Sequence, residues 1–194
     1  NYYNGDSDNY NISRYAWGDD YHLVIKSKLK ELLLHIQNDL NEKAKGIICV
    51  DTSPLLEKQW SKRAGIGWQG KNSLLLNEEF GSWLFLGELL LDIELEYDDP
   101  FTKDLCGSCT ACVDACPTNA LLDYQLDASK CISYLTVEYK GDFNSNHKNN
   151  LNEWIYGCDI CQLVCPWNLK VQGLTSEKSF LPKKEIQQYN IIDW

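Results

Sequence analysis

Eight of the nine cysteines are spaced like ligands of iron–sulfur clusters. The first set has the spacing C-x2-C-x2-C-x3-C, precedes Pro117, and consists of Cys106, Cys109, Cys112 and Cys116. Bacterial two-cluster ferredoxins use this run, in which three cysteines bind one [4Fe–4S] cluster and the fourth binds the other. A tight loop brings sulfurs at these spacings close together. The run therefore predicts iron–sulfur chemistry.

A second cysteine set completes the count for two clusters. Cys158, Cys161 and Cys165 have the spacing C-x2-C-x3-C and precede Pro166, and Cys131 supplies the missing fourth thiolate. The ferredoxin crossover rule predicts how the eight are shared. One cluster takes Cys106, Cys109, Cys112 and Cys165. The other takes Cys116, Cys131, Cys158 and Cys161.

Zinc and disulfides are weaker alternatives for these cysteines. Structural zinc sites commonly use two separated C-x2-C pairs rather than one run that ends in Cys-Pro. Disulfides between neighbours in one loop would close almost no chain. The ninth cysteine, Cys49, lies in the apolar run Gly46–Val50, where a buried packing role is expected rather than a reactive thiol.

The composition indicates a folded, acidic chain. It has 194 residues, of which 44% are hydrophobic and 12% aromatic, and a formal net charge of −10. That charge argues against general nucleic-acid binding, so a nucleic-acid substrate requires a local basic patch. The longest apolar run, Trp83–Leu91, is too short to span a membrane and contains Glu88. Methionine is absent and no secretion signal opens the sequence, so we expect part of a longer, cytoplasmic chain.

The pattern before residue 100 predicts a mixed helix and strand domain. Leucine and isoleucine recur at three- and four-residue steps over residues 20–43, which predicts an amphipathic helix with Leu23, Leu29, Leu32, Leu33, Ile36 and Leu40 on its apolar face. Ile47–Val50 reads as a buried strand. A second helix is expected to be capped by Thr52 or Ser53, with Pro54 in its first turn and Gly65 at its end.

The remaining segments suggest the domain organisation. Ser73–Leu76 and Trp83–Leu95 have strand character, and Asp98–Pro100 breaks the pattern. We place the domain boundary there, which gives domains at 1–99 and 100–170 and a C-terminal segment at 171–194. Residues 1–13 and 140–153 are polar and aperiodic, so both are expected to be loops. The predicted fold class is α+β.

Asp51 and His22 are the candidate catalytic side chains outside the cysteine sets. Asp51 follows a predicted buried strand, and a carboxylate there often lines a cleft, although it could equally be a neighbour of a helix cap. His22 could bind a metal, but a histidine satisfied by its surroundings is the simpler interpretation. Gly65–Lys71 resembles a phosphate-binding loop, but Asn72 replaces the hydroxyl residue and the segment follows a helix. A glycine-rich turn near a ligand, or a plain tight turn, is favoured instead.

Several blocks of sequence together resemble the epoxyqueuosine reductase family. They run in order along nearly the whole chain and comprise Arg14–His22, Val50–Pro54, Arg63–Ser73, Gly81–Leu89, Cys131–Thr136 and Tyr156–Asn168. The cysteine spacing is general to ferredoxins, whereas these flanking blocks are not.

The resemblance implies a fold, cofactors and a reaction. It implies a corrinoid-binding α/β domain, whose N-terminal part is expected to be incomplete here, followed by a bacterial two-cluster ferredoxin-like domain. The implied cofactors are cobalamin and two [4Fe–4S] clusters. The implied reaction reduces epoxyqueuosine to queuosine at the wobble position of tRNA. The signature by which a histidine ligates cobalt, D-x-H-x-x-G, is absent.

The resemblance also implies roles for single residues. Asp51 matches the family's proposed proton donor. The corrin-facing positions correspond to Lys71, Asn72, Ser73 and Leu75, and Ser133 is expected between cluster and corrinoid. Candidates for a basic face toward the anticodon arm are Lys62, Arg63, Lys71, Lys130 and Lys140.

The implied partners are tRNA and an external low-potential electron donor, with a monomer expected and no membrane. Two other functions remain open at this point. A two-cluster electron-transfer module predicts clusters without a corrinoid. A reductive dehalogenase-like corrinoid enzyme would use an aromatic hydroxyl supported by a basic residue as its proton donor.

Overall fold

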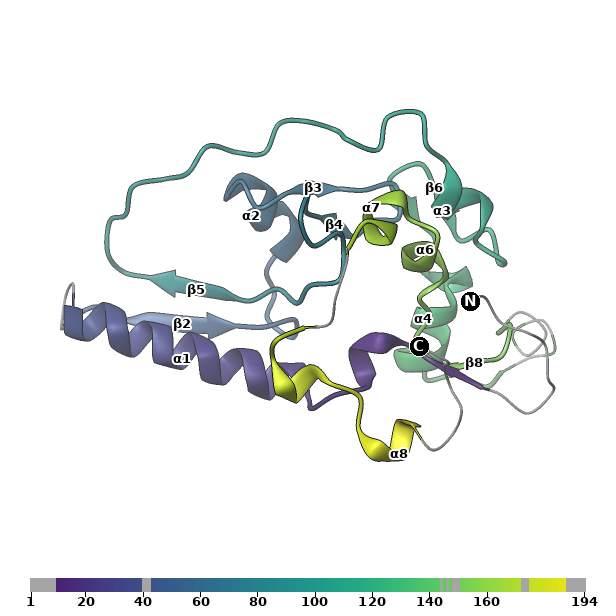
Figure 1. Cartoon of the computed structure of the whole chain (residues 1–194), viewed down its shortest axis with the longest axis horizontal. Coiled ribbons are helices and arrows are strands. Elements are labelled where there is room, and N and C mark those ends of the chain that lie inside the picture. The colour runs from purple at the N-terminus through teal and green to yellow at the C-terminus, as the bar shows by residue number, and fades with distance from the viewer. Residues whose placement is uncertain are drawn as a thin grey trace. The chain divides into compact units, whose positions relative to one another are not determined.

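The computed structural model describes residues 10–39, 43–143, 145, 147, 151–171 and 175–187 (Figure 1). These residues form two compact units. The helix–sheet unit comprises residues 20–70 and 74–105. The cysteine unit comprises the described residues within 1–19, 71–73 and 106–194.

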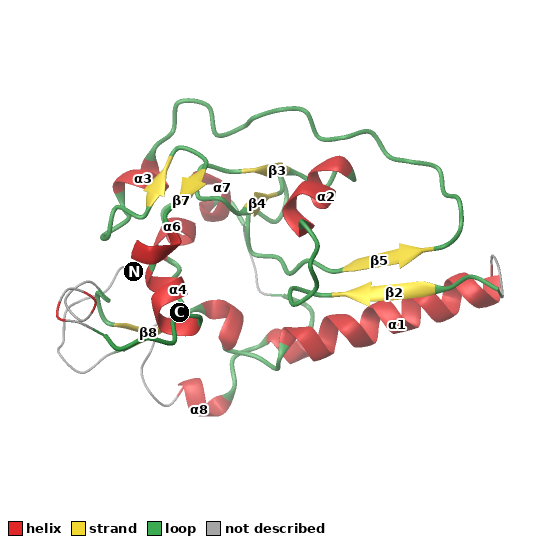
Figure 2. Ribbon diagram, turned by 180° about the vertical axis from the view of Figure 1, so that it is seen from behind, coloured by secondary structure: helices red, strands yellow, loops and turns green. Residues whose placement is uncertain are grey.

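The helix–sheet unit is built on one long helix and two small antiparallel sheets. Strand β2 (Gly46–Cys49) pairs with β5 (Glu88–Leu91), and the register runs from Gly46 opposite Leu91 to Cys49 opposite Glu88. Strand β3 (Trp68–Gln69) pairs with β4 (Leu75–Leu76), and helix α2 (Glu57–Arg63) packs against this hairpin. Helix α1 (Tyr21–Asp39) runs beside β2 and β5 (Figures 1 and 2).

The predicted first helix is confirmed, with a different apolar face. The half-buried residues Ile25, Leu29, Leu33 and Ile36 recur at three- and four-residue steps along α1. Leu23 is 69% exposed and Leu32 is 48% exposed, so both point away from that face. The sequence pattern had included them because six apolar residues in one helix fit more than one stripe.

The start predicted for the second helix is wrong. Helix α2 begins at Glu57, and the residues from Asp51 to Leu55 form successive bends instead. Two short backbone bonds, from Thr52 N–H to the Val50 carbonyl and from Leu55 N–H to the Ser53 carbonyl, bend the chain too tightly for a helix. The helix does end before Gly65, as predicted, and Gly65 adopts a φ of 73°.

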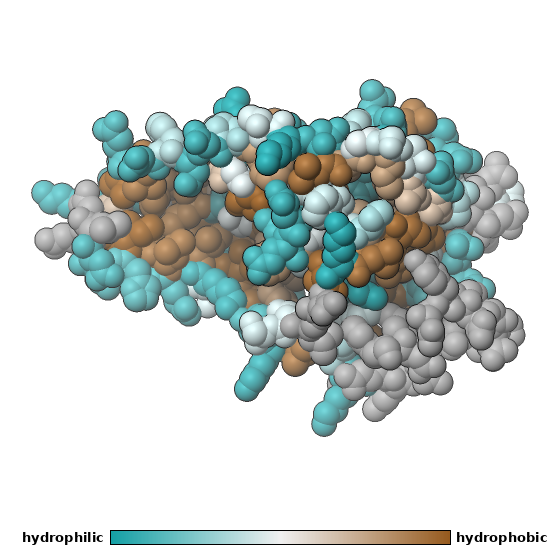
Figure 3. Space-filling model, turned by 45° about the horizontal axis from the view of Figure 1, so that its top comes forward, coloured by the Kyte–Doolittle hydropathy of each residue, from teal (hydrophilic) through white to brown (hydrophobic). Residues whose placement is uncertain are grey.

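The predicted strands are present but shorter. Ser73–Leu76 contributes only β4, and Trp83–Leu95 contributes only β5. Trp68, Leu76 and Val50 are almost fully buried in this unit, and Trp68 stacks on Phe101 with ring centroids 5.5 Å apart. The same unit carries apolar surface near α1, β2 and β5 (Figure 3). In β2, Ile47 is 66% exposed.

The cysteine unit joins the start of the described chain to its later part. Strand β1 (Asn11–Ile12) pairs in parallel with β8 (Trp154–Tyr156), so this part of the predicted N-terminal loop is a strand. Its buried apolar residues include Trp17, Leu121, Ile132, Leu135 and Trp154. The other elements are η1 (Arg14–Ala16), α3 (Ala111–Asp114), β6 (Leu121–Leu122), β7 (Gln125–Leu126), η2 (Ala128–Lys130), α4 (Ile132–Val137), α6 (Ile160–Leu163), α7 (Pro166–Leu169), η3 (Lys178–Phe180) and α8 (Lys184–Gln187).

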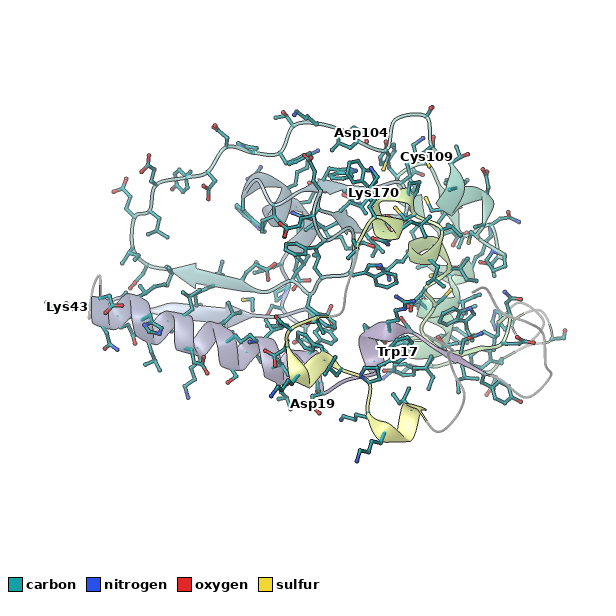
Figure 4. The ribbon with its side chains drawn as sticks, viewed as in Figure 1. Trp17, Asp19, Lys43, Asp104, Cys109 and Lys170 are labelled. Carbon is teal, nitrogen blue, oxygen red and sulfur yellow. The ribbon has the colours of Figure 1, made fainter. Side chains whose placement is uncertain are left out.

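The C-terminal segment also packs on the N-terminal part of this unit. The Asp19 N–H donates to the Ser179 carbonyl at 2.6 Å, and the Lys183 N–H donates to the Trp17 carbonyl at 2.9 Å. Trp17 and Asp19 are labelled in Figure 4. Residues 10–19 therefore belong with the cysteines, and the boundary between units falls between Leu105 and Cys106, later than the Asp98–Pro100 break. Much of the predicted loop at 140–153, and residues 1–9, lie outside the described residues.

Across the residues that the structure describes, none of the helices combines the length and the apolar character needed to cross a membrane.

Gly67 provides a test of the hairpin's packing. A Cβ at this position would lie 1.9 Å from the Leu76 carbonyl oxygen, which belongs to backbone and cannot rotate away. We expect Gly67→Ala to destabilise the protein by about 1–3 kcal/mol, measured as a lower urea midpoint. Gly46→Ala is the control, because its Cβ would first meet the movable side-chain ends of Leu33 and Leu89. Equal midpoints for the two variants would contradict the packing described here.

Candidate functional site

Asp51 stands where a buried strand gives way to an exposed turn. Val50 before it is fully buried, whereas the Asp51 side chain is 55% exposed. Its backbone adopts a φ of 52°, a left-handed conformation that is uncommon for residues other than glycine but tolerated by aspartate. The predicted position at the carboxyl end of the strand is therefore confirmed. A helix-cap role is not, because α2 begins six residues later.

His22 connects Asp51 to a second carboxylate. Its Nε2 lies 3.3 Å from Asp51 Oδ2, and its Nδ1 lies 2.8 Å from Asp20 Oδ1. The pKa of Asp20 is lowered, first by its hydrogen bond to the His22 side chain. The three side chains form a line along which a proton can pass. The sequence placed Asp20 next to His22, but nothing in its pattern indicated that both would reach Asp51.

Tyr21 packs against the same carboxylate. Its ring stacks on Phe85 at 4.6 Å and on His22 at 4.1 Å. Burial raises the pKa of Tyr21, and the charge of Asp51 and a hydrogen bond to it raise it further. Tyr21 is therefore held in its neutral form, as a hydrogen-bond donor to Asp51.

Two glutamates lie behind the Asp51 turn. Glu57, the first residue of α2, accepts a hydrogen bond from the Asp51 N–H at 2.6 Å. Glu88, the first residue of β5, has both carboxyl oxygens buried, and within the described chain neither makes a hydrogen bond of ordinary geometry. Burial and the neighbouring Glu57 carboxyl raise the pKa of Glu88 to about 7. No sequence motif pointed to this pair.

The cysteines of the first run are arranged around α3. Cys109 is exposed on the turn before the helix (Figure 4), and its N–H donates to the Cys106 carbonyl at 3.1 Å. Burial raises the pKa of Cys112, and the nearby thiols of Cys165 and Cys106 raise it further. Cys165 therefore lies with Cys106 and Cys112, although it follows Cys112 by 53 positions in the sequence.

A second group of thiols gathers around α6. Burial raises the pKa of Cys158, and the thiols of Cys131 and Cys116 add to this effect. Burial also raises the pKa of Cys161, which lies near Cys158 and also near Cys112 and Cys131. In Cys116, hydrogen bonds from Thr118 and Ala120 outweigh the effect of burial and lower the pKa.

The donor chemistry of these thiols fits clusters better than single ions. Among the described residues, no three cysteine, histidine, aspartate or glutamate side chains converge closely enough to bind one metal ion. In a [4Fe–4S] cluster each cysteine binds a different iron, so the sulfurs stand further apart. Cys49 is separate from both groups, buried in β2.

Asp159 ties the second thiol group to the N-terminal segment. Asp159 lies between Cys158 and Cys161 in the sequence, and its side chain is buried. It accepts hydrogen bonds from the Ser13 hydroxyl and, at 2.8 Å, from the Arg14 N–H. The first block of the family resemblance, from Arg14 onward, therefore begins beside the cysteine loop.

The five positions predicted to face cobalamin differ in how far their side chains are exposed for contact with a ligand. Lys71 and Asn72 are buried in the cysteine unit, where Lys71 Nζ lies 3.6 Å from Asp123 Oδ2. Ser73 has a φ of 63°, and Ser133 is half-buried in α4. These polar groups suit a ring edged with amides. The Leu75 side chain is 3% exposed in the hairpin core, so only its backbone could meet a ligand.

The proposed basic residues are divided between the two units, with Lys62 and Arg63 in the helix–sheet unit and Lys71, Lys130 and Lys140 in the cysteine unit. Lys71 is buried beside Asp123, so it is not available for a basic face. Lys130 pairs with Asp127 at 3.1 Å. In the helix–sheet unit, Lys62 and Arg63 end α2, and the Arg63 guanidinium lies 5.1 Å from the ring of Trp60, which is 49% exposed.

Two family models match the chain, one in its later part and one at its start. Residues 105–168 match the family described as "4Fe-4S double cluster binding domain". Residues 1–52 match "Epoxyqueuosine reductase QueG, DUF1730".

Curated epoxyqueuosine reductases resemble the chain along most of its length. The protein of Cyclobacterium marinum is 51% identical over 178 residues, which cover 91% of this chain and 57% of that protein. The protein of Leadbetterella byssophila is 49% identical over 189 residues, which cover 97% of this chain and 61% of that protein. The chain thus spans about three-fifths of the length of these two relatives.

Solved structures of the same enzyme share the fold. An epoxyqueuosine reductase crystallised with an epoxyqueuosine-modified tRNA-Tyr stem loop superposes with a TM-score of 0.83 at 37% identity, covering 91% of this chain and 46% of that one. The Bacillus subtilis enzyme, solved with its catalytic aspartate loop swung out of the active site, gives a TM-score of 0.81 at 36% identity with the same coverage. Over the part that these proteins share with it, the chain is similar in sequence and in fold to epoxyqueuosine reductases.

Proposed function

We propose that the protein containing this chain reduces epoxyqueuosine in tRNA to queuosine. The observation that carries the proposal is that the relationship to epoxyqueuosine reductases extends over both units. A relative bound to a modified tRNA stem loop supports the substrate class.

The reaction consumes two electrons and two protons, and it converts an epoxide into an alkene and water. Two [4Fe–4S] clusters would supply single electrons at low potential, received from an external donor. One cluster would be held by Cys106, Cys109, Cys112 and Cys165. The other would be held by Cys116, Cys131, Cys158 and Cys161. Bound cobalamin would supply a strongly reducing centre at the substrate. The polar turn at Lys71, Asn72 and Ser73, together with Ser133, would contact it.

The chain's own carboxylates serve the proton side of the reaction. The epoxide oxygen leaves as water only if it is protonated, and an Asp51 carboxyl within reach would donate that proton. His22 contacts Asp51 on one side and Asp20 on the other, so it can resupply the proton. The stacked, neutral Tyr21 orients the Asp51 carboxylate and shields one side of it from water.

The Asp51 turn is proposed to be a moving part. The Bacillus subtilis relative was solved with its catalytic aspartate loop swung out of the active site. In this chain Asp51 is the first residue of an exposed, non-helical turn in a left-handed conformation. Such a turn can open and close without disrupting β2 or α2.

The two alternative functions account for fewer observations. An electron-transfer module explains the cysteine unit but leaves the match over residues 1–52 unexplained. A dehalogenase-like mechanism would need an aromatic hydroxyl with a basic supporter. Tyr21 lies beside carboxylates, which raise its pKa and make it a poorer acid.

Replacement of Asp51 tests the proton-donor assignment. We expect Asp51→Asn to lower turnover of an epoxyqueuosine-modified tRNA stem loop by about 10²-fold or more, with iron content and cobalamin binding unchanged. Asp98→Asn, on an exposed loop, is the matched control and should keep wild-type turnover. Wild-type turnover by Asp51→Asn would remove this residue from the mechanism.

Replacement of Cys165 tests how the thiols are shared. We expect Cys165→Ala to lose the cluster held by Cys106, Cys109 and Cys112 and to keep the other, whereas Cys131→Ala should show the reverse pattern. The two clusters can be followed by iron analysis and by their separate EPR signals. Cys49→Ala should keep both clusters. Loss of the same cluster in the Cys165 and Cys131 variants would disprove the predicted partition.

A further inference from the structure

Two carboxyl groups that have no place in the proposed chemistry lie directly behind Asp51. Glu57 belongs to α2 and Glu88 to β5, and β5 pairs with β2, the strand that leads into Asp51. Opposite Glu88 in the register is Cys49, two residues before Asp51. The pair is therefore built from the helix and the strand that flank the Asp51 turn.

One member of the pair holds the Asp51 backbone. The Asp51 N–H donates to Glu57 Oε1 at 2.6 Å, a short, charge-assisted bond. Asp51 also adopts a φ of 52°, a left-handed conformation that is uncommon for residues other than glycine, and its backbone N–H points to Glu57 in this conformation. The hydrogen bond from the Asp51 N–H therefore joins the Glu57 side chain directly to the backbone of the turn.

The other member, Glu88, has Glu57 as a neighbouring carboxyl group. Both Glu88 oxygens are buried and, in the described part of the chain, form no hydrogen bond of ordinary geometry. Burial and the Glu57 carboxyl both favour a proton on Glu88. A neutral Glu88 can donate its hydroxyl proton to the Glu57 carboxylate, and two ionised carboxylates in this position would repel.

We propose that Glu57 is a positioning residue that latches the Asp51 turn in its closed conformation, and that the buried Glu88 carboxyl behind it holds Glu57 in place. The latch acts through backbone position and takes no part in the proton transfer. The inference rests on the proposed role of Asp51 as proton donor. It also explains how the turn could open: release of the Asp51 N–H from Glu57 would free the Asp51 backbone while β2 and α2 stay intact.

Variants of Glu57 separate a latch from a general structural role. Glu57→Ala removes the acceptor, so we expect the amides of residues 51–56 to exchange hydrogen at least tenfold faster, and kcat to fall about tenfold to 10²-fold with little change in KM. Glu57→Gln keeps an acceptor for the Asp51 N–H and should restore slow exchange and most of the turnover. Glu79→Ala, which changes an exposed glutamate of the same unit, is the control.

The outcomes distinguish this inference from the proposed function. Unchanged exchange at residues 51–56 in Glu57→Ala would overturn the latch, whatever the activity. Asp51→Asn should lower turnover by about 10²-fold or more without speeding exchange at these amides, because its N–H remains. If Asp51→Asn keeps wild-type turnover while Glu57→Ala still speeds exchange, the catalytic role fails and the latch stands.

A pH series tests the role of Glu88 and does not depend on Glu57→Ala folding. Glu88→Gln mimics the protonated acid, since its amide can donate to Glu57 at any pH. With the pKa of Glu88 near 7, we expect residues 51–56 to exchange equally in wild type and Glu88→Gln at pH 6, and several-fold faster in wild type at pH 8.5. The other titratable groups near this region are the same in both proteins, namely Asp51, Glu57, Cys49, Tyr21 and His22. The ratio of the exchange rates in wild type and Glu88→Gln therefore reports the effect of Glu88. A ratio that stays at one across this range would exclude a protonated Glu88 as part of the latch.

Discussion

The antiparallel pairing of β2 with β5 is the constraint on which the arrangement around Asp51 depends. It sets Cys49 opposite Glu88, buries Val50, and brings the end of one strand beside the start of the other. Because side chains alternate between the faces of a strand, a slip of one residue would turn Glu88 to the opposite face. Gly87, just before it, leaves room for Ile25 and Leu29 of α1, and this helix carries Tyr21 and His22 at its start. Register and helix packing together assemble the acid, its histidine and the carboxyl pair.

The cysteine unit is stabilised in a different way from the helix–sheet unit. Its helices α3, α6 and α7 have four residues each, and helices this short have little stability of their own. The segments are held by strand pairing with residues 11–12, by the buried Asp159 and, in our account, by the clusters themselves. Metal binding and folding are commonly coupled in such small units. Because these short segments have little stability of their own, contacts from residues distant in the sequence help to hold them. Ser13 and Arg14, which bond to Asp159, therefore belong to this unit.

The sequence anticipated the features that have short, local signatures. Cysteine spacing indicated the iron–sulfur unit, helical periodicity located α1, and the apolar run before Asp51 located β2. It failed where distant contacts decide the outcome. Thr52 and Ser53 look like helix caps, yet the turn that carries Asp51 displaces the helix to Glu57. The glycines at 65 and 67 suggested a ligand-binding turn, but a Cβ there would meet the carbonyls of Asp99 and Leu76, so their small size serves the chain's own packing. The Glu57–Glu88 pair unites a helix and a strand thirty-one positions apart, which no local pattern records.

The account predicts that one protein combines a low-potential electron path with a positioned carboxylic acid. The most direct measurement is anaerobic single-turnover conversion of an epoxyqueuosine-modified tRNA stem loop, with both clusters reconstituted, cobalamin added and a low-potential reductant present. Nucleosides would be separated and identified by mass spectrometry. The account predicts that epoxyqueuosine disappears and queuosine, its product without the epoxide oxygen, appears in equal amount. Intact epoxyqueuosine in a protein that has bound both clusters and cobalamin would contradict it.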